Sequence, residues 1–141
     1  MYKRQSLHER GDSFFTENVY EEKVVDVISL DDFAIENGLT FIDYAKFDIE
    51  GHELFALEGF QTFISSGKVG AFSFEFGSGN LNSKTTFRNF WDFLHENYLI
   101  YIITPSGKLE IIEQYYEDLE FYRGVSNFIA RLKKESNKIL R

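Results

Sequence analysis

The stretch Ala45–Glu53, A-K-F-D-I-E-G-H-E, decides how the rest of the chain is interpreted. Its apolar residues alternate with charged ones, and side chains two positions apart lie on the same face of a β-strand. The charged face would carry Lys46, Asp48 and Glu50. Gly51 then ends the strand and a helical pattern follows. In open α/β sheets, ligands bind at this carboxyl end of the strands.

The composition restricts the class of protein. The chain has 141 residues, 43% of them hydrophobic and 18% aromatic, which is typical of one globular domain. Its 16 Phe and 8 Tyr predict a core built of aromatic rings. The net charge of −8 argues against a nucleic-acid partner, because such proteins need a basic surface. There is no cysteine, no apolar run of about 20 residues and no signal-peptide pattern. We therefore predict a cytoplasmic protein without a membrane partner, and leave the oligomeric state open.

Hydrophobic periodicity predicts six strands and three helices. The predicted strands are Lys23–Leu30, Phe41–Glu50, Val69–Phe76, Tyr98–Thr104, Leu109–Glu113 and Ser126–Leu132. The predicted helices are Asp31–Ile35, Glu53–Ser66 and Thr85–Asn97. The first is short, with Ser29 or Asp31 as its N-cap, and it ends at Asn37-Gly38. The second ends at Gly67. Gly77–Lys84 is expected to be a loop, and Tyr115–Arg123 a loop or a short helical turn.

This order predicts an α/β fold with a mixed, mostly parallel sheet, flanking helices and a C-terminal hairpin. We expect residues 1–22 to be an irregular N-terminal segment and residues 133–141 a charged tail. Residues 23–132 would form the folded part.

Four motifs in a fixed order resemble a known family. They are V-x-V-I-S-L-D-D-F at 25–33, I-D-Y-A-K-F-D-I-E-G-H-E at 42–53, A-L-E-G-F at 56–60 and F-S-F-E-F at 72–76. Together they resemble the C-terminal half of FkbM-family methyltransferases, which are similar in fold to class I S-adenosylmethionine-dependent methyltransferases with a Rossmann-like sheet. Ser126–Ala130 also resembles the closing strand of that family.

The resemblance implies S-adenosylmethionine as cofactor and a small-molecule methyl acceptor such as a hydroxyl of a sugar or polyketide. It does not include the family's first half, with the glycine-rich loop that wraps the cofactor. Residues 77–80, G-S-G-N, begin in a similar way but lack the third glycine, so we expect a flexible loop there. On this interpretation the chain is a fragment without activity of its own.

Two expectations follow from the fragment hypothesis. The opening residues Met1–Gln5 resemble a translated sequencing adapter, which would place the natural start further upstream. In the doubly wound strand order the missing strands lie beside Ala45–Glu50, so this strand would be left with an unpaired edge.

Six residues are candidates for the site, each with a structural alternative. The catalytic candidates are Asp48, Glu50, His52 and Glu75, and the cofactor-binding candidates are Lys46, Asp48 and Gly51. Asp48 or Glu50 would orient the acceptor or the cofactor's amino group by charge-assisted hydrogen bonds, or would instead cap the next helix or pair with Lys46. Lys46 would neutralise these carboxylates, or would instead extend from the sheet face into solvent. His52 would be a general base or a residue at a helix start, and Gly51 would permit a close backbone approach.

If the two strands are adjacent and parallel, Glu75 and Asp48 converge on one edge of a cleft. Oxygen ligands from these carboxylates would also suit a hard cation, although the family is not generally of that type, and we assign no metal ligand. The alternative function is a non-catalytic α/β module whose acidic face binds a metal or a partner.

Overall fold

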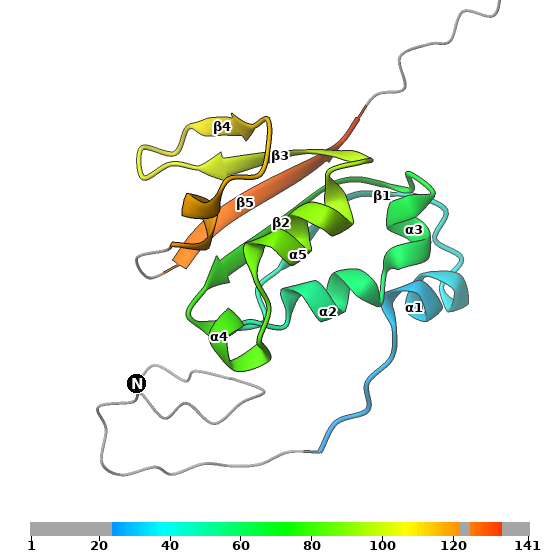
Figure 1. Cartoon of the computed structure of the whole chain (residues 1–141). Helices are drawn as coiled ribbons and strands as arrows, with labels where there is room; N and C mark the ends of the chain where they lie inside the picture. The colour runs from blue at the N-terminus through cyan, green and yellow to red at the C-terminus, as the bar shows by residue number, and fades with distance from the viewer. Residues whose placement is uncertain (1–23, 122–124, 134–141) are drawn as a thin grey trace, which may run out of the picture.

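The computed structural model describes residues 24–121 and 125–133 and consists of one five-stranded sheet with helices on one of its faces (Figure 1). The strands are β1 (Ile42–Phe47), β2 (Val69–Gly77), β3 (Tyr98–Ile103), β4 (Leu109–Ile112) and β5 (Val125–Leu132). The helices are α1 (Leu30–Glu36), α2 (Glu53–Glu58), α3 (Gln61–Ser65), α4 (Gly79–Ser83), α5 (Phe87–Leu94) and the 3₁₀ turn η1 (Glu117–Glu120). The predictions for residues 1–22, including the adapter-like start, and for the tail after Lys133 lie outside the described residues.

The sheet order is β1-β2-β5-β3-β4, and among the described strands only β1 and β2 are parallel neighbours. The three other pairs are antiparallel. The prediction of a mostly parallel sheet is therefore wrong, because β5 inserts between β2 and β3 and runs against both. The predicted hairpin of β3 and β4 is confirmed.

β1 lies at the edge of the sheet, with β2 as its one neighbour among the described residues. This is the arrangement expected if further strands belong beside it. The remaining predicted strands after it are confirmed, with ends that differ by a few residues.

The first predicted strand is wrong. Residues 24–29 form no strand in this structure, and β-branched side chains such as Val24 and Val27 are exposed. A strand needs a neighbour for its backbone hydrogen bonds, and the described part of the chain provides none here. Helix α1 follows directly, and the Ser29 hydroxyl accepts a hydrogen bond from the Asp32 backbone N–H at 3.0 Å, which confirms Ser29 as its N-cap.

The predicted helix Glu53–Ser66 is two helices, α2 and α3, with a break at Gly59. The break has a tertiary cause. The Asp31 backbone N–H donates to the Gly59 carbonyl at 2.9 Å, and the Asp31 carboxylate accepts from the backbone N–H groups of Thr62 and Phe63 at 2.8 and 3.1 Å. Asp31 therefore caps a new helix start inside the predicted one. Gly67 has φ 66°, as expected of the residue that ends α3.

The core lies between the sheet and the helices and consists largely of phenylalanine rings, as the composition predicts. The ring of Phe74 stacks on Phe90 of α5 at 4.8 Å and on Phe128 of β5 at 5.5 Å between centroids. Phe72 is fully buried beside Tyr98. Because these rings occupy alternate positions of β2 and β5, the other face of both strands points away from the helices.

Candidate functional site

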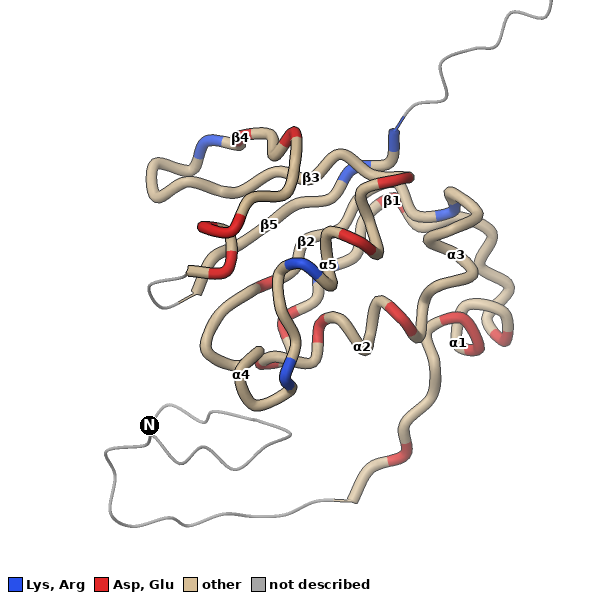
Figure 2. The backbone as a smooth tube through the Cα atoms, viewed as in Figure 1, with Lys and Arg blue, Asp and Glu red and all other residues tan. Residues whose placement is uncertain are grey.

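The parallel pair of β1 and β2 brings the predicted carboxylates to one end of the sheet. Phe47 pairs with Phe74 and both are buried against the helices, whereas Lys46 pairs with Ser73 on the opposite face. Continuing this register by one residue places Asp48 beside Glu75. Acidic positions accordingly gather where the two strands end, beside α4 and the start of α2 (Figure 2).

Lys46 and Asp48 form an exposed ion pair, with 2.8 Å between the lysine Nζ and the Asp48 Oδ2. The hydrogen bond from Lys46 to Asp48, together with the attraction of the two charges, raises the pKa of the lysine. This pair is the structural alternative that we gave for Asp48, and it shows Lys46 neutralising a carboxylate rather than standing alone on the sheet face. The lysine remains a fixed positive charge at the edge of the acidic group.

Glu75 is half-buried on the same face. Its partial burial raises the pKa of its carboxyl above the usual value, and the negative charges of Asp48, Glu53 and Glu50 add to this effect. Lys46 acts in the opposite direction. A carboxyl whose pKa is raised by both desolvation and like charges is typical of functional sites, although structural networks also produce such shifts.

The turn after β1 has an unusual backbone that is held by Glu53. Glu50 has φ 58° and Gly51 has φ 102°, so a residue with a side chain adopts a left-handed conformation next to the glycine. The Glu53 Oε1 accepts hydrogen bonds from the backbone N–H groups of Ile49 at 3.0 Å and Gly51 at 3.2 Å. Backbone conformations of this kind persist where surrounding contacts enforce them, and they often occur at ligand sites.

Glu53 itself is completely buried, and its Oε2 has no hydrogen-bond partner in the described residues. In the sequence, Glu53 begins the predicted helix Glu53–Ser66, and it is not among the candidates for the site. The sequence did contain a signal for this role. Glu53 follows Ile49 by four positions, and a carboxylate in the first helical turn can accept hydrogen bonds from the backbone of the turn before the helix.

A second turn packs against this one. A Cβ on Gly51 would lie 2.4 Å from backbone atoms of Gly79, and one on Gly79 would lie 2.7 Å from the Glu50 carbonyl oxygen. The G-S-G-N segment is therefore not the flexible loop that we predicted, since its last two residues begin helix α4 and Gly79 touches the β1–α2 turn through backbone atoms.

Asn80 fixes this second turn and was missed from the sequence. Its side chain is buried, accepts a hydrogen bond from the Gly77 N–H at 2.8 Å and donates one to the Thr85 hydroxyl at 2.9 Å. Asparagine following a glycine-rich turn commonly bonds its own backbone in this way, which was the available signal.

The two turns enclose a hollow of about 20 Å³, enough for a group of the size of one water molecule. It is lined by Glu50, Gly51, Glu53, Glu75, Gly77, Ser78, Gly79, Asn80 and Val125. The structure thus brings together Glu50, Gly51 and Glu75, with Asp48 and Lys46 beside them.

His52 is not one of the residues that line this hollow. Its ring lies 5.7 Å from the ring of Phe55, and its Nδ1 is buried. In addition, no group of three or more His, Cys, Asp or Glu residues within 24–121 and 125–133 is arranged to hold a metal ion.

Comparison with known proteins now identifies the family. A family model described as Methyltransferase FkbM domain matches residues 2–100, well over half of the chain. The chain belongs to the FkbM methyltransferase family. No curated protein and no solved structure matches it. The match includes residues 2–5, which we had predicted to be a translated adapter, and ends before β4 and β5, whereas we had expected the resemblance to continue to residue 132.

FkbM-family membership implies methyl transfer in general and suggests a small-molecule acceptor. The motifs on which the resemblance rested have structural roles in this FkbM domain. Asp31 of L-D-D-F binds Gly59 of A-L-E-G-F and caps α3, and Glu53 holds the turn after β1. Within the described residues, no helix is long and apolar enough to cross a membrane.

Proposed function

We propose that this chain forms the acceptor-side half of an S-adenosylmethionine-dependent methyltransferase that acts on a hydroxyl of a sugar, a polyketide or another small metabolite. The observation that carries the proposal is the acidic end of the parallel pair β1·β2 in a chain of the FkbM family. Ligands of open α/β sheets bind at this end of the strands.

The negative charge of the site suits S-adenosylmethionine, whereas the volume of the hollow suits only a small part of that cofactor. In the described part of the chain, the four carboxylates Asp48, Glu50, Glu53 and Glu75 are accompanied by one cation, Lys46, so the site favours a positively charged ligand. S-adenosylmethionine carries an ammonium and a sulfonium group. A hollow of about 20 Å³ accommodates a single small group, which supports the view that these residues form one wall of a larger site.

The cofactor supplies an electrophilic methyl group, and the residues of this chain position and deprotonate the acceptor. Asp48 and Glu50 orient the acceptor or the cofactor's ammonium by charge-assisted hydrogen bonds. Glu75, whose pKa is raised above the usual value, would accept the proton of the acceptor hydroxyl. Lys46 holds Asp48 in place, and Gly51 allows the close approach of the turns.

His52 is the weakest of the candidates. Its ring lies against Phe55 outside the hollow, so we assign it a place in the start of α2 rather than a proton-transfer role.

The described part of this chain contains no glycine-rich loop of the kind that wraps the cofactor, and the edge of β1 is open within it. We infer that residues 23–132 need the complementary half of a methyltransferase domain for activity. Strands of that half would pair with β1, satisfy its outer backbone groups and complete the cofactor site.

Calorimetric titration with S-adenosylhomocysteine tests both parts of this proposal. The chain alone should give no binding heat, whereas the chain fused behind the N-terminal half of an FkbM-family domain should bind. Glu75→Gln in the fusion should lower kcat and flatten its pH profile, while Glu58→Gln on the exposed side of α2 should leave both unchanged. Tight binding by the isolated chain would contradict the half-domain, and full activity of Glu75→Gln would contradict the assigned base.

A further inference from the structure

The face of the sheet opposite the helices is uncovered in the described structure (Figure 1). Its middle row runs across three strands through Ile129, Tyr101 and Ile111, which are register partners. Ile111 is 46% exposed, and Leu99 on the neighbouring row is 37% exposed. Contiguous apolar residues on a sheet face are typical of surfaces that are covered in the functional state.

Charges occupy the two ends of this open face and have opposite signs. Arg131 lies on the row with Ala71 and Leu99, at one end of the strands. Glu75 lies on the row with Asn127, four residues further along β2. Arg131 is exposed, so its guanidinium is accessible to a partner.

This order of charges is self-complementary under one two-fold axis. Consider a two-fold axis that lies in the plane of contact and runs perpendicular to the strands. The apolar middle rows of the two copies then meet each other. The row that carries Arg131 in one copy meets the row that carries Glu75 in the other. Arg131 of each copy then approaches the end that carries Glu75 of the other. An axis along the strands would instead bring the two Arg131 side chains together, which is unfavourable.

We propose that the open face packs against the same face of a second copy of this chain, with the two-fold axis across the strands. The inference does not depend on methyl transfer. It describes an isologous sheet-on-sheet contact, in which the same surface serves both partners.

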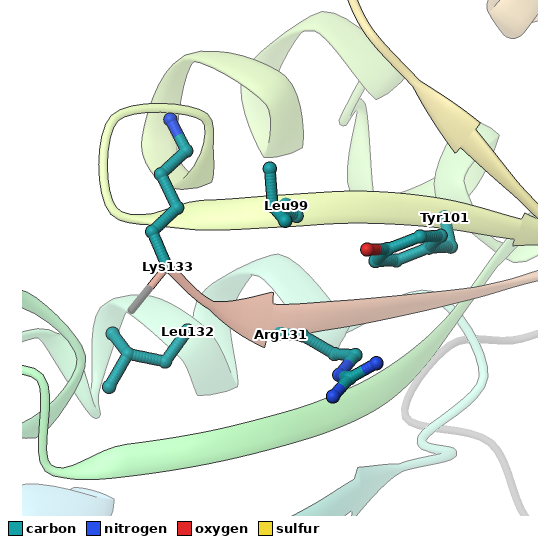
Figure 3. Close-up of a pocket in the computed structure, with 5 residues that line it drawn as sticks. All are labelled: Leu99, Tyr101, Arg131, Leu132 and Lys133. Carbon is teal, nitrogen blue, oxygen red and sulfur yellow. The ribbon is translucent and has the colours of Figure 1, made fainter. Parts of the chain in front are cut away.

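A hollow at the Arg131 end fits the opposite end of a second copy. It has a volume of about 470 Å³ and is lined by Leu99, Tyr101, Arg131, Leu132 and Lys133 (Figure 3). The two-fold axis places the row of Ile103 and Leu109 of the other copy over this hollow, and Leu109 is 47% exposed. Apolar side chains would thus fill it while Arg131 reaches the acidic end.

The size of the face predicts weak association. Five strands about 4.8 Å apart, each contributing about five residues at about 3.3 Å, give a footprint of roughly 400 Å² per copy. The total of roughly 800 Å² is below the about 1,000 Å² expected of a stable interface, so the contact should be transient. The net charge of −8 on each copy opposes association, and salt at about 0.15 M screens part of this repulsion. Lys46, at the edge of the middle row, is neutralised by Asp48.

Sedimentation equilibrium of the full chain, from low to high micromolar concentration, tests the contact. The average mass should rise from 16.6 kDa toward twice that value. Arg131→Glu and Glu75→Arg should each weaken dimerisation by about tenfold or more, because like charges then face each other. Lys68→Glu, on the helix side beside Phe63, makes the same change in net charge as Arg131→Glu and should cause a much smaller effect.

Mixing the two weakened variants gives the decisive result. An equimolar mixture of the Arg131→Glu and Glu75→Arg chains should form a one-to-one heterodimer, because both ends then pair opposite charges. A wild-type chain that stays monomeric would overturn the proposal. So would a mixture that remains monomeric, or association that neither charge reversal weakens, which would place the contact elsewhere, as at the open edge of β1.

Discussion

Replacing Glu53 should separate its role in holding a turn from the effect of its charge. Its Oε1 accepts two backbone hydrogen bonds, from Ile49 and Gly51. A hydrogen bond to a charged group contributes about 1.5–3 kcal/mol, so Glu53→Ala removes about 3–6 kcal/mol of interaction. The substitution also removes the buried Oε2, which has no hydrogen-bond partner among the described residues, and this regains about 1–3 kcal/mol of stability. Taking the two ranges together, we expect Glu53→Ala to lower the free energy of unfolding by about 2–3 kcal/mol.

Glu53→Gln keeps the acceptor oxygen and removes the charge, so its stability should lie within about 1 kcal/mol of the wild type. Urea denaturation at pH 7, followed by the fluorescence of Trp91, measures both values. Glu58→Ala, on the exposed side of the same helix, is the matched control and should change little. An equal loss for the Gln and Ala variants, or a loss below about 1 kcal/mol for Ala, would refute the role assigned to Glu53.

The same pair of variants reports on the site. The negative charge of Glu53 is one of the causes that raise the pKa of Glu75. Glu53→Gln should therefore lower the pKa of the Glu75 carboxyl, measured by NMR titration of its side-chain carbon. An unchanged or higher pKa would show that the two carboxylates do not interact.

Three further predictions concern backbone fit, capping and pH. Gly51→Ala should cost about 3 kcal/mol or more in urea denaturation, because its Cβ would overlap Gly79, whereas Gly38→Ala has open space and should cost only about 1 kcal/mol for its positive φ. Asp31→Ala should lower the free energy of unfolding by about 1–2 kcal/mol, because it removes the cap of α3. Thermal unfolding measures this loss, and an unchanged melting temperature would contradict the role of the cap. Because the pKa of Glu75 is raised above 4.5 in the folded state, the wild type should lose stability as pH rises from about 4.5 through that pKa. Glu75→Gln should lack this loss, and parallel pH profiles of the two proteins would contradict the assignment.

Local patterns in the sequence determined much of the secondary structure. The alternation in Val69–Phe76 gives a strand with buried rings on one face because side chains of a strand alternate by geometry alone. Ser29 and Gly67 were identifiable as helix ends because capping and left-handed conformations depend on the residue and its nearest neighbours. The convergence of Asp48 and Glu75 also followed, once β1 and β2 were taken as parallel neighbours.

Tertiary structure alone decided the rest. The direction of β5 depends on pairing with β2 and β3, which are distant in sequence, and no local pattern specifies that choice. Residues 24–29 have strand-forming side chains, but no other strand among the described residues lies beside them. Without a partner strand for its backbone hydrogen bonds, the segment does not form a strand despite its β-propensity. The break between α2 and α3 requires Asp31 from another helix.

The site shows the same division. The sequence determined which charged and glycine residues are present and that they follow a strand, because those are properties of adjacent residues. Only the folded chain decided that Glu53 turns inward to hold two backbone N–H groups and that Gly51 meets Gly79. These contacts depend on how closely two separate turns can pack, which is a property of the assembled backbone and of no single segment.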